Sequence, residues 1–321
     1  MKVVHISKTP LAGSPSRISD ALNNYTEFES CHFIESDYPG SLNGKMSAHS
    51  ILIDEGGKRD WLLKEALKNA EIVHVHNDIS GSVANCFSLC RDDCKFIYHV
   101  HSPLREGPLF SNVSEDIGVD FDLKMVVAQY HPRHYQGYVP VLNIVPFKSS
   151  VKVIENNEIP RVLFSPAHRR TGGRWNDKVS DGLQIALESL ARFNKIELLE
   201  VDGLKPYELF SLRKYCHITI DEIVTGSYHQ ISLEGLAAGN VVISNSDFFS
   251  DMFLKMLTGC TYSPFLKANS SSIYDVLMGL VSDPVKIRNK QVESLEFYNK
   301  YLSPSVIIKK YVEAYNGLLN A

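Results

Sequence analysis

A loop and the helix that follows it bring together residues suited to binding an anion and a sugar hydroxyl. Thr225, Gly226, Ser227 and Tyr228 offer backbone N–H groups where the loop would enter the helix, and a helix start of this kind favours anions. Glu234 follows on the helix and can accept two hydroxyl hydrogen bonds. A carboxylate beside a phosphate site suits the ribose of a nucleotide.

The same stretch also has an ordinary structural interpretation. Small residues dominate the predicted helix from Ser232 to Gly239, and Val241–Ile243 reads as a buried strand. Small side chains allow another backbone or a ligand to approach closely, but Gly239 also suits the end of an ordinary helix. From spacing alone, a nucleotide site and a plain helix–strand corner both stay open.

A second group of candidate residues lies in a glycine-bearing loop after the predicted strand Arg161–Phe164. This loop carries the cations Arg169, Arg170, Arg174 and Lys178 beside a pair of glycines. Several cations so close together suit a diphosphate, because each can donate charged hydrogen bonds to phosphate oxygens. The alternative is a solvated basic loop without a ligand.

Two His-x-His pairs, His74/His76 and His99/His101, raise the question of a metal site. Alternate residues of a strand share a face, so each pair could offer two imidazoles to one ion. No carboxylate at a typical ligand spacing completes either pair. We therefore expect no metal site, with His74 and His99 buried and hydrogen-bonded within strands, and His76 and His101 at the strand tips.

Two further metal motifs are weaker. Asp120 and Asp122 could hold Mg²⁺ on a nucleotide, but they precede a predicted strand and therefore lie at the wrong end of a sheet. Cys86, Cys90 and Cys94 recur at helical spacing. Small thiols buried on one helix face explain that spacing better than a metal.

Length and composition narrow the class of protein. At 321 residues the chain is long enough for two domains of about 150 residues each. A net charge of −4 argues against binding nucleic acid through a broad basic surface. The six cysteines form no dense disulfide framework, which favours a reducing cytoplasm. No stretch reaches the roughly 18 apolar residues of a membrane span, and the first residues lack the apolar core of a signal peptide.

Strands and helices alternate along both halves of the chain. In the first half, we predict strands at Val3–Ile6, Ile72–Val75, Phe96–Val100 and Met125–Ala128, with helices at Arg17–Asn24, Trp61–Leu67 and Ser80–Cys90. A polar linker at Lys148–Pro160 separates these elements from a second alternation. Such alternation predicts two doubly wound α/β domains, with ligands at the carboxyl ends of parallel strands.

These features together resemble glycosyltransferases of the GT-B fold over nearly the whole chain. More narrowly, they resemble the retaining, nucleotide-sugar-dependent group that builds bacterial surface polysaccharides such as lipopolysaccharide or capsule. The resemblance rests on the tandem α/β halves, the basic loop, and the motif of Glu, small residues and Gly from Glu234 to Gly239. It implies two Rossmann-like domains with an interdomain cleft: an acceptor-binding domain (1–146), a nucleotide-sugar-binding domain (147–303), and a C-terminal helix (304–321) that crosses back to the first domain.

The resemblance also implies roles for particular residues. Gly13, in the loop after the first strand, would approach the donor diphosphate, and His101 would touch the donor sugar. Arg169 and Lys178 would clamp the diphosphate, with Arg170 or Arg174 as alternatives to Arg169. The backbone amides of Ser227, Tyr228 and His229 would assist, and Glu234 would bind the ribose.

One departure from the family pattern concerns donor recognition. The family commonly has a second Glu upstream of the ribose-binding one, and that position here is Gly226. Some members instead read Asp-Gln followed by Gly-Trp-Tyr-Gly, which Asp221-Glu222 and Gly226–His229 approximate.

The function implied is sugar transfer from a nucleotide-diphosphate donor to a glycan or lipid-linked acceptor, with retention of configuration. Cations and N–H groups aimed at the leaving diphosphate lower the barrier, so neither a metal nor another cofactor is expected. We expect no nucleic-acid partner, and a cytoplasmic location that includes peripheral contact with the inner face of the membrane. The alternatives are a nucleotide-sugar epimerase of the same fold and a noncatalytic nucleotide-sugar-binding module.

Overall fold

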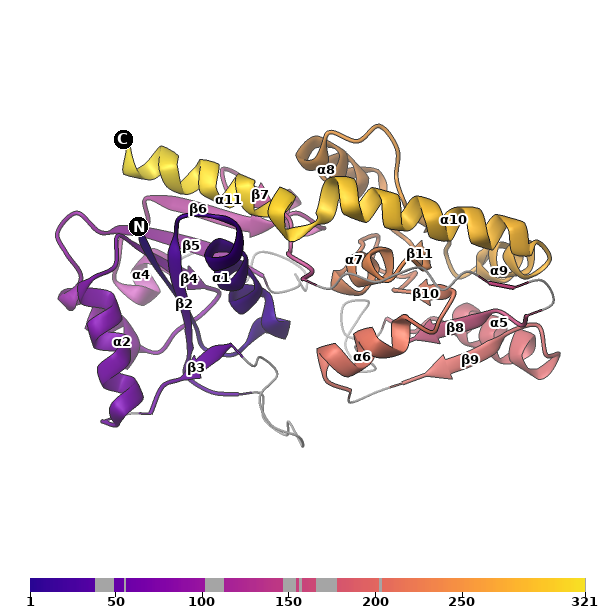
Figure 1. The fold of residues 1–321 in the computed structure, drawn as a ribbon, viewed down its shortest axis with the longest axis horizontal. Coiled ribbons are helices and arrows are strands. Elements are labelled where there is room, and N and C mark those ends of the chain that lie inside the picture. Colours follow the sequence, from indigo (N-terminus) through magenta and orange to yellow (C-terminus); the bar gives the residue numbers. More distant parts are fainter. Residues whose placement is uncertain are drawn as a thin grey trace. The chain divides into compact units, whose positions relative to one another are not determined.

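The computed structural model divides into two compact units (Figure 1). Unit 1 comprises Met1–Pro146 and Pro304–Ala321, and unit 2 comprises Phe147–Ser303. The structure describes residues 1–37, 49–54, 56–101, 113–146, 154–155, 158–165, 178–201 and 204–320. Each unit is an α/β domain built on one parallel sheet, so the prediction of two doubly wound α/β domains is confirmed.

The described residues of unit 1 form a seven-stranded sheet in the order β3-β2-β1-β4-β5-β6-β7. Every strand pair is parallel, so all carboxyl ends meet at one edge. The strands are β1 (Lys2–Ser7), β2 (Glu29–Ile34), β3 (Ser50–Leu52), β4 (Ile72–His76), β5 (Lys95–Val100), β6 (Leu123–Val127) and β7 (Val139–Val141).

Helices surround this sheet in Figure 1. The α-helices are α1 (Ser14–Tyr25), α2 (Lys58–Lys68), α3 (Gly81–Ala84), α4 (Val113–Ile117) and α11 (Pro304–Leu319), with 3₁₀ turns η1 (Leu11–Gly13), η2 (Asn85–Leu89) and η3 (His131–Arg133). The last helix, α11, lies beside α1. It is anchored by Tyr311 and Tyr315, which are both fully buried, and the Tyr311 hydroxyl donates to the carbonyl of Leu142 at 3.1 Å.

Alternation along the central strand β4 separates two environments. Val73 and Val75 join the apolar core that also contains Leu63 and Leu67 of α2. His74 and His76 point to the opposite face of the sheet. One face of unit 1 is therefore an ordinary hydrophobic core, and the other carries buried imidazoles.

The described residues of unit 2 form a five-stranded parallel sheet in the order β12-β11-β10-β8-β9. The strands are β8 (Arg161–Phe164), β9 (Glu197–Glu200), β10 (Ile218–Ile220), β11 (Val241–Ser244) and β12 (Leu266–Lys267). The helices are α5 (Asp181–Arg192), α6 (Pro206–Arg213), α7 (Gln230–Ala237), α8 (Phe248–Thr258), α9 (Ile273–Val281) and α10 (Pro284–Phe297), followed by the π-helical turn η4 (Tyr298–Leu302).

Helix α7 packs closely on this sheet at Gly235. A Cβ atom added to Gly235 would lie 2.8 Å from Cγ2 of Val242 and 3.1 Å from Cγ2 of Thr219, so only glycine fits there. The helix ends at Gly239, whose φ of +70° is left-handed, and the next N–H donates to the carbonyl of Gly235 at 2.9 Å. The expected C-capping role of Gly239 is confirmed.

Several element boundaries differ from the sequence-based prediction. Helix α1 begins at Ser14 instead of Arg17, because Gly13 takes a left-handed conformation (φ +80°) just before it and Pro15 pre-sets the first turn. The predicted helix Ser80–Cys90 is one short α-helical turn followed by the 3₁₀ turn η2. Within the described part of the chain, no helix combines the length and the apolar character needed to cross a bilayer.

Candidate functional site

The first turn of α7 is held by a carboxylate at the carboxyl end of β10. Oδ2 of Asp221 accepts hydrogen bonds from the backbone N–H of His229 at 2.6 Å and from the hydroxyl of Ser232 at 2.7 Å. Asp221 is almost completely buried. Asp221 therefore caps the amino end of α7 although it lies outside that helix, and it fixes the start of α7 at the carboxyl end of β10.

Glu222 shapes the loop between β10 and α7. Its Oε2 accepts from the backbone N–H groups of Val224 and Thr225, both at 2.7 Å, and its Oε1 accepts from the Thr225 hydroxyl. The side chain of Glu222 is buried. Because the loop satisfies both oxygens, this carboxylate is a structural part of the turn.

Gly226 is the next residue whose conformation the loop requires. Its φ of +81° is left-handed, and an added Cβ would lie 3.3 Å from Oδ2 of Asp247. Its carbonyl accepts from the Asp247 N–H and from the Ser250 hydroxyl, both at 3.1 Å. The loop is thus fastened to the start of α8, and a glutamate in place of Gly226 would be strained.

Lys178 contacts the start of α7 through His229. Lys178 Nζ donates to Nε2 of His229 at 2.9 Å, because an ammonium has donors and no acceptor. The other ring nitrogen of His229 is Nδ1. That nitrogen faces Oδ1 of Asp221 at 3.3 Å and Oε1 of Glu222 at 3.7 Å. We call Asp221, Glu222, His229 and Lys178 the carboxylate–histidine–lysine network.

Burial and charge oppose each other in this network. Burial lowers the pKa of Lys178, while Asp221 and Glu222 oppose that shift. Burial raises the pKa of Asp221, but the interactions with His229, Ser232 and Lys178 outweigh it, so the pKa of Asp221 lies below its usual value. Two carboxylates on the far side of an imidazole therefore offset part of the cost of burying Lys178.

Glu234 is buried on α7 and pairs with a residue that no motif predicted. Its Oε2 lies 3.6 Å from Nε of Arg213, and its Oε1 accepts from the Gln230 amide at 3.5 Å. Arg213 is completely buried, and its Nη1 donates to the Thr219 hydroxyl at 3.4 Å. Burial lowers the pKa of Arg213, and Glu234 opposes that shift.

The side chains of Ser227 and Tyr228 point inward. The Ser227 hydroxyl donates to the carbonyl of Tyr228 at 2.8 Å, and the Tyr228 ring packs against Phe265 with centroids 5.3 Å apart. Tyr228 is completely buried, which raises its pKa. These side chains build the loop, so any contact of this pair with a ligand would be made by the backbone.

In unit 1, the loop after β1 holds Gly13 next to a buried guanidinium. The N–H of Gly13 donates to the carbonyl of Pro10 at 2.8 Å. An added Cβ on Gly13 would lie 3.6 Å from Nε of Arg17, which is itself buried. The Ser14 hydroxyl donates to Oδ1 of Asn143 at 2.8 Å, so the start of α1 is fixed to the segment after β7.

His101 is held at the carboxyl end of β5 by two bonds. Its backbone N–H donates to Oδ1 of Asn77 at 2.7 Å, and its Nε2 lies 2.8 Å from Nδ1 of His76. Burial, with smaller contributions from His131 and His32, lowers the pKa of His101 to about 3. The ring is neutral near pH 7 and can donate or accept a hydrogen bond.

The His-x-His pairs confirm one expectation and correct another. His76 lies at the end of β4 as predicted and is completely buried there, because His5, His99 and His101 surround its ring. His99 is buried as expected, yet within the described residues neither of its ring nitrogens has a hydrogen-bond partner. The expected hydrogen bond is present for His74, whose Nδ1 lies 2.7 Å from the Tyr315 hydroxyl.

The remaining candidate residues are the arginines of the basic loop, the acidic pair and the cysteines. Arg169, Arg170 and Arg174 lie outside the described residues. Asp122 lies at the amino end of β6, as predicted, where Oδ2 accepts from the N–H of Phe96 at 2.8 Å and Oδ1 lies 3.6 Å from Lys95 Nζ. The cysteines at helical spacing, like the other three, are free thiols.

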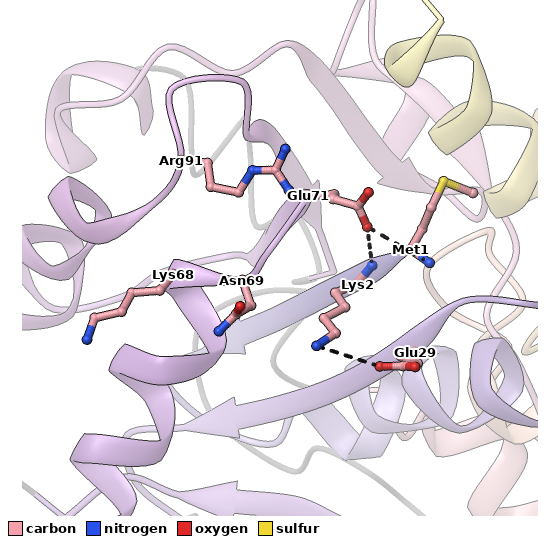
Figure 2. A pocket seen from close by; sticks show the side chains of 7 residues that line it. All are labelled: Met1, Lys2, Glu29, Lys68, Asn69, Glu71 and Arg91. Atoms are coloured by element: carbon pink, nitrogen blue, oxygen red, sulfur yellow. Dashed lines mark hydrogen bonds and ion pairs between the residues drawn. The ribbon is translucent and has the colours of Figure 1, made fainter.

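A polar pocket lies at the amino ends of the unit 1 strands, at the opposite sheet edge from Gly13 and His101 (Figure 2). It has a volume of about 300 Å³ and is lined by Met1, Lys2, Glu29, Lys68, Asn69, Glu71 and Arg91. Lys2 Nζ lies 4.0 Å from Glu29, and Arg91 pairs with Asp93 at 2.6 Å. These cations already have acidic partners, so the pocket has little unpaired charge with which to bind an anion.

No family model and no curated protein matches the sequence. Solved structures, in contrast, are similar over the full chain. HepE from Anabaena in complex with UDP-glucose has a TM-score of 0.61 at 10% identity, and the match covers 99% of this chain and 100% of that one. Sucrose-phosphate synthase from Thermosynechococcus elongatus has a TM-score of 0.56 at 12% identity, with 100% of both chains covered.

The UDP-GlcNAc 2-epimerase of Neisseria meningitidis bound to UDP-GlcNAc is also similar, with a TM-score of 0.50 at 11% identity over 99% of this chain and 100% of that one. At such identities the likeness establishes the fold. The chain has two Rossmann-like, parallel-sheet α/β domains of the GT-B type.

Proposed function

We propose that the protein transfers a sugar from a nucleotide-diphosphate donor to a glycan or lipid-linked acceptor, with retention and without a metal at the transfer step. The observation that carries this proposal is the cation at the start of α7. Lys178 and His229 meet there, at the carboxyl end of β10, where ligands of open α/β sheets bind.

We propose that the ammonium of Lys178 is the group of this network that contacts a diphosphate. His229 stands between the two acidic residues, which face Nδ1, and Lys178, which contacts Nε2. The ammonium has three N–H donors and uses one for His229, which leaves donors for phosphate oxygens. The backbone N–H groups of Ser227 to His229 and the start of α7 add positive potential. We propose that Arg169 and Arg170 add to this site.

We further propose that Glu234 accepts hydrogen bonds from the ribose. A carboxylate has about four lone-pair positions and can accept hydrogen bonds from two neighbouring hydroxyl groups. Oε2 of Glu234 also lies 3.6 Å from Nε of Arg213.

For unit 1, the roles of Gly13 and His101 are proposals that follow from the resemblance. The glycine backbone at Gly13 would approach a phosphate, and His101 would contact a sugar. We propose that unit 1 binds the acceptor and unit 2 the nucleotide sugar. The reaction would take place in the cytoplasm, at the inner face of the membrane when the acceptor is lipid-linked.

A second candidate function is epimerisation of a nucleotide sugar, which the likeness to the Neisseria epimerase favours. The two activities differ in their need for an acceptor. An epimerase would convert the donor sugar with no acceptor present, whereas a transferase would release nucleoside diphosphate in proportion to the glycan formed. A noncatalytic module, as the glycine at position 226 could indicate, would bind the donor and leave it intact.

A thermal-shift screen against nucleoside diphosphates and their sugars tests the binding site. A ligand at 100 times its Kd stabilises the folded state by about 2.7 kcal/mol. We expect Lys178→Gln to weaken binding of the best ligand at least about tenfold, because a charged hydrogen bond contributes about 1.5–3 kcal/mol. Lys195→Gln, at an exposed lysine of the same unit, serves as the control. Equal affinity in Lys178→Gln and wild type would remove the lysine from the site.

A further inference from the structure

Histidines from three neighbouring strands lie together on one face of the unit 1 sheet. The parallel register pairs His5 of β1 with His74 of β4, and His76 of β4 with His99 of β5. The rings of His74 and His76 stack with centroids 4.2 Å apart, and those of His5 and His74 with centroids 4.9 Å apart. All four side chains have no exposed surface.

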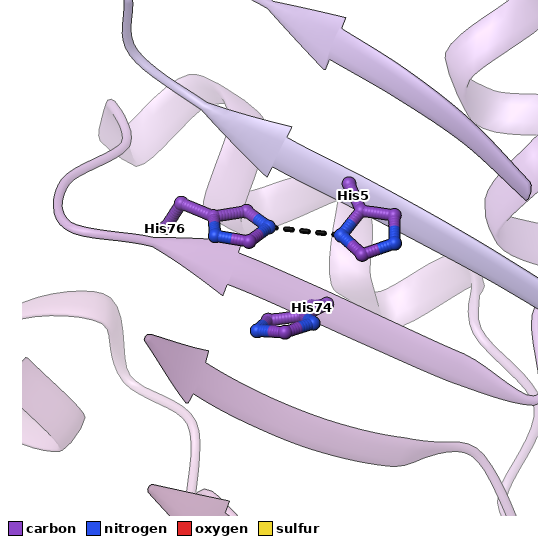
Figure 3. Close-up of side chains that lie close together, drawn as sticks. All are labelled: His5, His74 and His76. Carbon is purple, nitrogen blue, oxygen red and sulfur yellow. Dashed lines mark hydrogen bonds between the residues drawn. The ribbon is translucent and has the colours of Figure 1, made fainter. Parts of the chain in front are cut away.

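Three of these rings bring ligand atoms into one small volume (Figure 3). One ring nitrogen each from His5, His74 and His76 lies within 4.8 Å of the others. Nδ1 of His5 lies 2.9 Å from Nε2 of His76. Within the part of the chain that the structure describes, Nε2 of His5 and Nε2 of His74 have no hydrogen-bond partner. A buried polar atom without a partner costs about 1–3 kcal/mol, so these nitrogens need an explanation.

The outer nitrogens of two of these rings are already fixed. Nδ1 of His74 lies 2.7 Å from the Tyr315 hydroxyl of α11, and Nδ1 of His76 lies 2.8 Å from Nε2 of His101. Metal-binding histidines almost always use their second nitrogen in such a bond, which fixes the tautomer and the ring orientation. With the proton on Nδ1, Nε2 of each of these two rings carries the lone pair that can bind a metal.

We propose that His5, His74 and His76 bind one transition-metal cation of the zinc class inside unit 1. The ion would take Nε2 of His74, Nε2 of His76 and one ring nitrogen of His5, in place of the hydrogen bond between His5 and His76. Three protein ligands suffice for a zinc site that completes its shell with a solvent molecule. Imidazole ligands favour zinc, copper or nickel over magnesium or calcium.

The unpartnered Nε2 atoms of His5 and His74 support a metal over a simple packing role, because buried polar atoms in a packed interior normally have a hydrogen-bond partner. The spacing of His74 and His76 alone did not indicate a site, because the sequence offers no nearby third ligand. The fold supplies that ligand as His5, from a strand far away in the chain.

His32 provides a matched control on the neighbouring strand. It is as deeply buried as the others, but Nε2 lies 2.9 Å from the Ser7 hydroxyl and Nδ1 lies 2.8 Å from the Ser50 hydroxyl. Both ring nitrogens are therefore satisfied without a metal. The proposed ion would tie β1 to β4 and, through Tyr315, to α11, and it is independent of the proposed sugar transfer.

Metal binding can be measured directly on the full-length chain, purified through an affinity tag without histidines. After treatment with a chelator, Co²⁺ is titrated and followed by its visible absorption, and Zn²⁺ is tested by competition and by its effect on the melting temperature. We expect one Co²⁺ per wild-type chain, displaced by Zn²⁺, and a higher melting temperature with Zn²⁺. His5→Gln and His74→Gln should lose the binding, and His32→Gln should keep it.

Tyr315→Phe keeps the ring in place while removing the hydroxyl, so it tests the site even when a histidine variant fails to fold. We expect it to weaken Co²⁺ binding about 10- to 100-fold, the usual effect of losing an outer-shell partner. The proposal is overturned when wild-type protein binds neither ion, when His74→Gln binds as tightly as wild type, or when His99→Gln abolishes binding and His5→Gln does not.

Discussion

The two units bury polar groups near the carboxyl ends of their strands in different ways. In unit 2 the buried groups carry opposite charges and face one another: Glu234 lies against Arg213, and Lys178 is joined through His229 to Asp221. Unit 1 buries the guanidinium of Arg17 beside Gly13, but the groups gathered on one face of its sheet are imidazoles, whose pKa burial lowers. Several of their nitrogens have no partner among the described residues.

This difference determines what each region can bind. Burying a charge costs far more than burying a neutral imidazole, so unit 2 can keep its charges inside only because each has a partner. We propose that this arrangement makes Lys178 available to an anion. Neutral imidazoles require no counter-charge, but their lone pairs remain available. The charged network of unit 2 is the part for which we propose a phosphate ligand, and the imidazole cluster of unit 1 is the part for which we propose a metal cation.

The largest expected effect comes from breaking the buried pair of unit 2. In Arg213→Met, Glu234 would be left buried without its cation, and we expect unit 2 to lose about 3–5 kcal/mol of stability. Urea unfolding measures the loss. The double variant Arg213→Met/Glu234→Gln removes both charges and should recover most of it. A loss below about 1 kcal/mol in the single variant would show that the pair is not what stabilises this site.

A smaller effect is expected from moving α7 away from the sheet. Gly235→Ala places a methyl group 2.8 Å from Cγ2 of Val242, and overpacking of this kind costs about 1–3 kcal/mol. The same shift would move Glu234 relative to Arg213. Gly279→Ala is the control in the same unit, because its new methyl would meet only the Lys286 amine at 3.9 Å. Equal stability of the two variants would contradict the close approach of α7.

Acid unfolding tests whether the imidazoles of unit 1 are neutral. Burial lowers the pKa of His32 to about 3, whereas the unfolded chain takes up the proton near pH 6.5. The stability from this group is therefore complete above pH 6.5 and is lost as the pH falls toward 3, by about 1.4 kcal/mol per pH unit. In His32→Gln, measured with a chelator present, the free energy of unfolding should depend less steeply on pH, because one proton fewer is taken up on unfolding. An unchanged slope would mean that His32 is already charged in the folded state.

Local patterns in the sequence were sufficient to predict several of the helices and strands of unit 2. Glu234, Gly239 and the strand after them are close together in the chain, so hydrophobic periodicity and helix-end rules predicted the α7–β11 corner. In α5, Leu183, Ala186, Leu187 and Leu190 recur at the spacing of one helix face, and all four are buried in the structure. The two α/β domains follow from the repeated alternation of such local elements.

Contacts between distant segments could not be predicted in this way. Arg213 lies at the end of α6 with no motif around it, and only the packing of α7 against β10 brings Glu234 to it. His5 joins His74 through the parallel pairing of β1 and β4. Both contacts depend on the order of the strands and the packing of the helices. Neither appears in the sequence as a regular spacing of residues.

The smallest expected effect concerns α11, the helix that carries Tyr315 onto the imidazole face. Gly317 lies within this helix, is exposed, and has nothing within 4 Å of an added Cβ. Gly317→Ala should therefore stabilise the helix by about 0.5–1 kcal/mol, because alanine loses less backbone freedom on folding. The chain enters α11 directly from unit 2, yet its contacts are with unit 1. When the two units unfold in separate transitions, Gly317→Ala should raise the midpoint of the unit 1 transition alone. The transition whose pH dependence changes in His32→Gln should be that same transition. A rise in the other transition would assign α11 to unit 2 and remove Tyr315 from the proposed metal site.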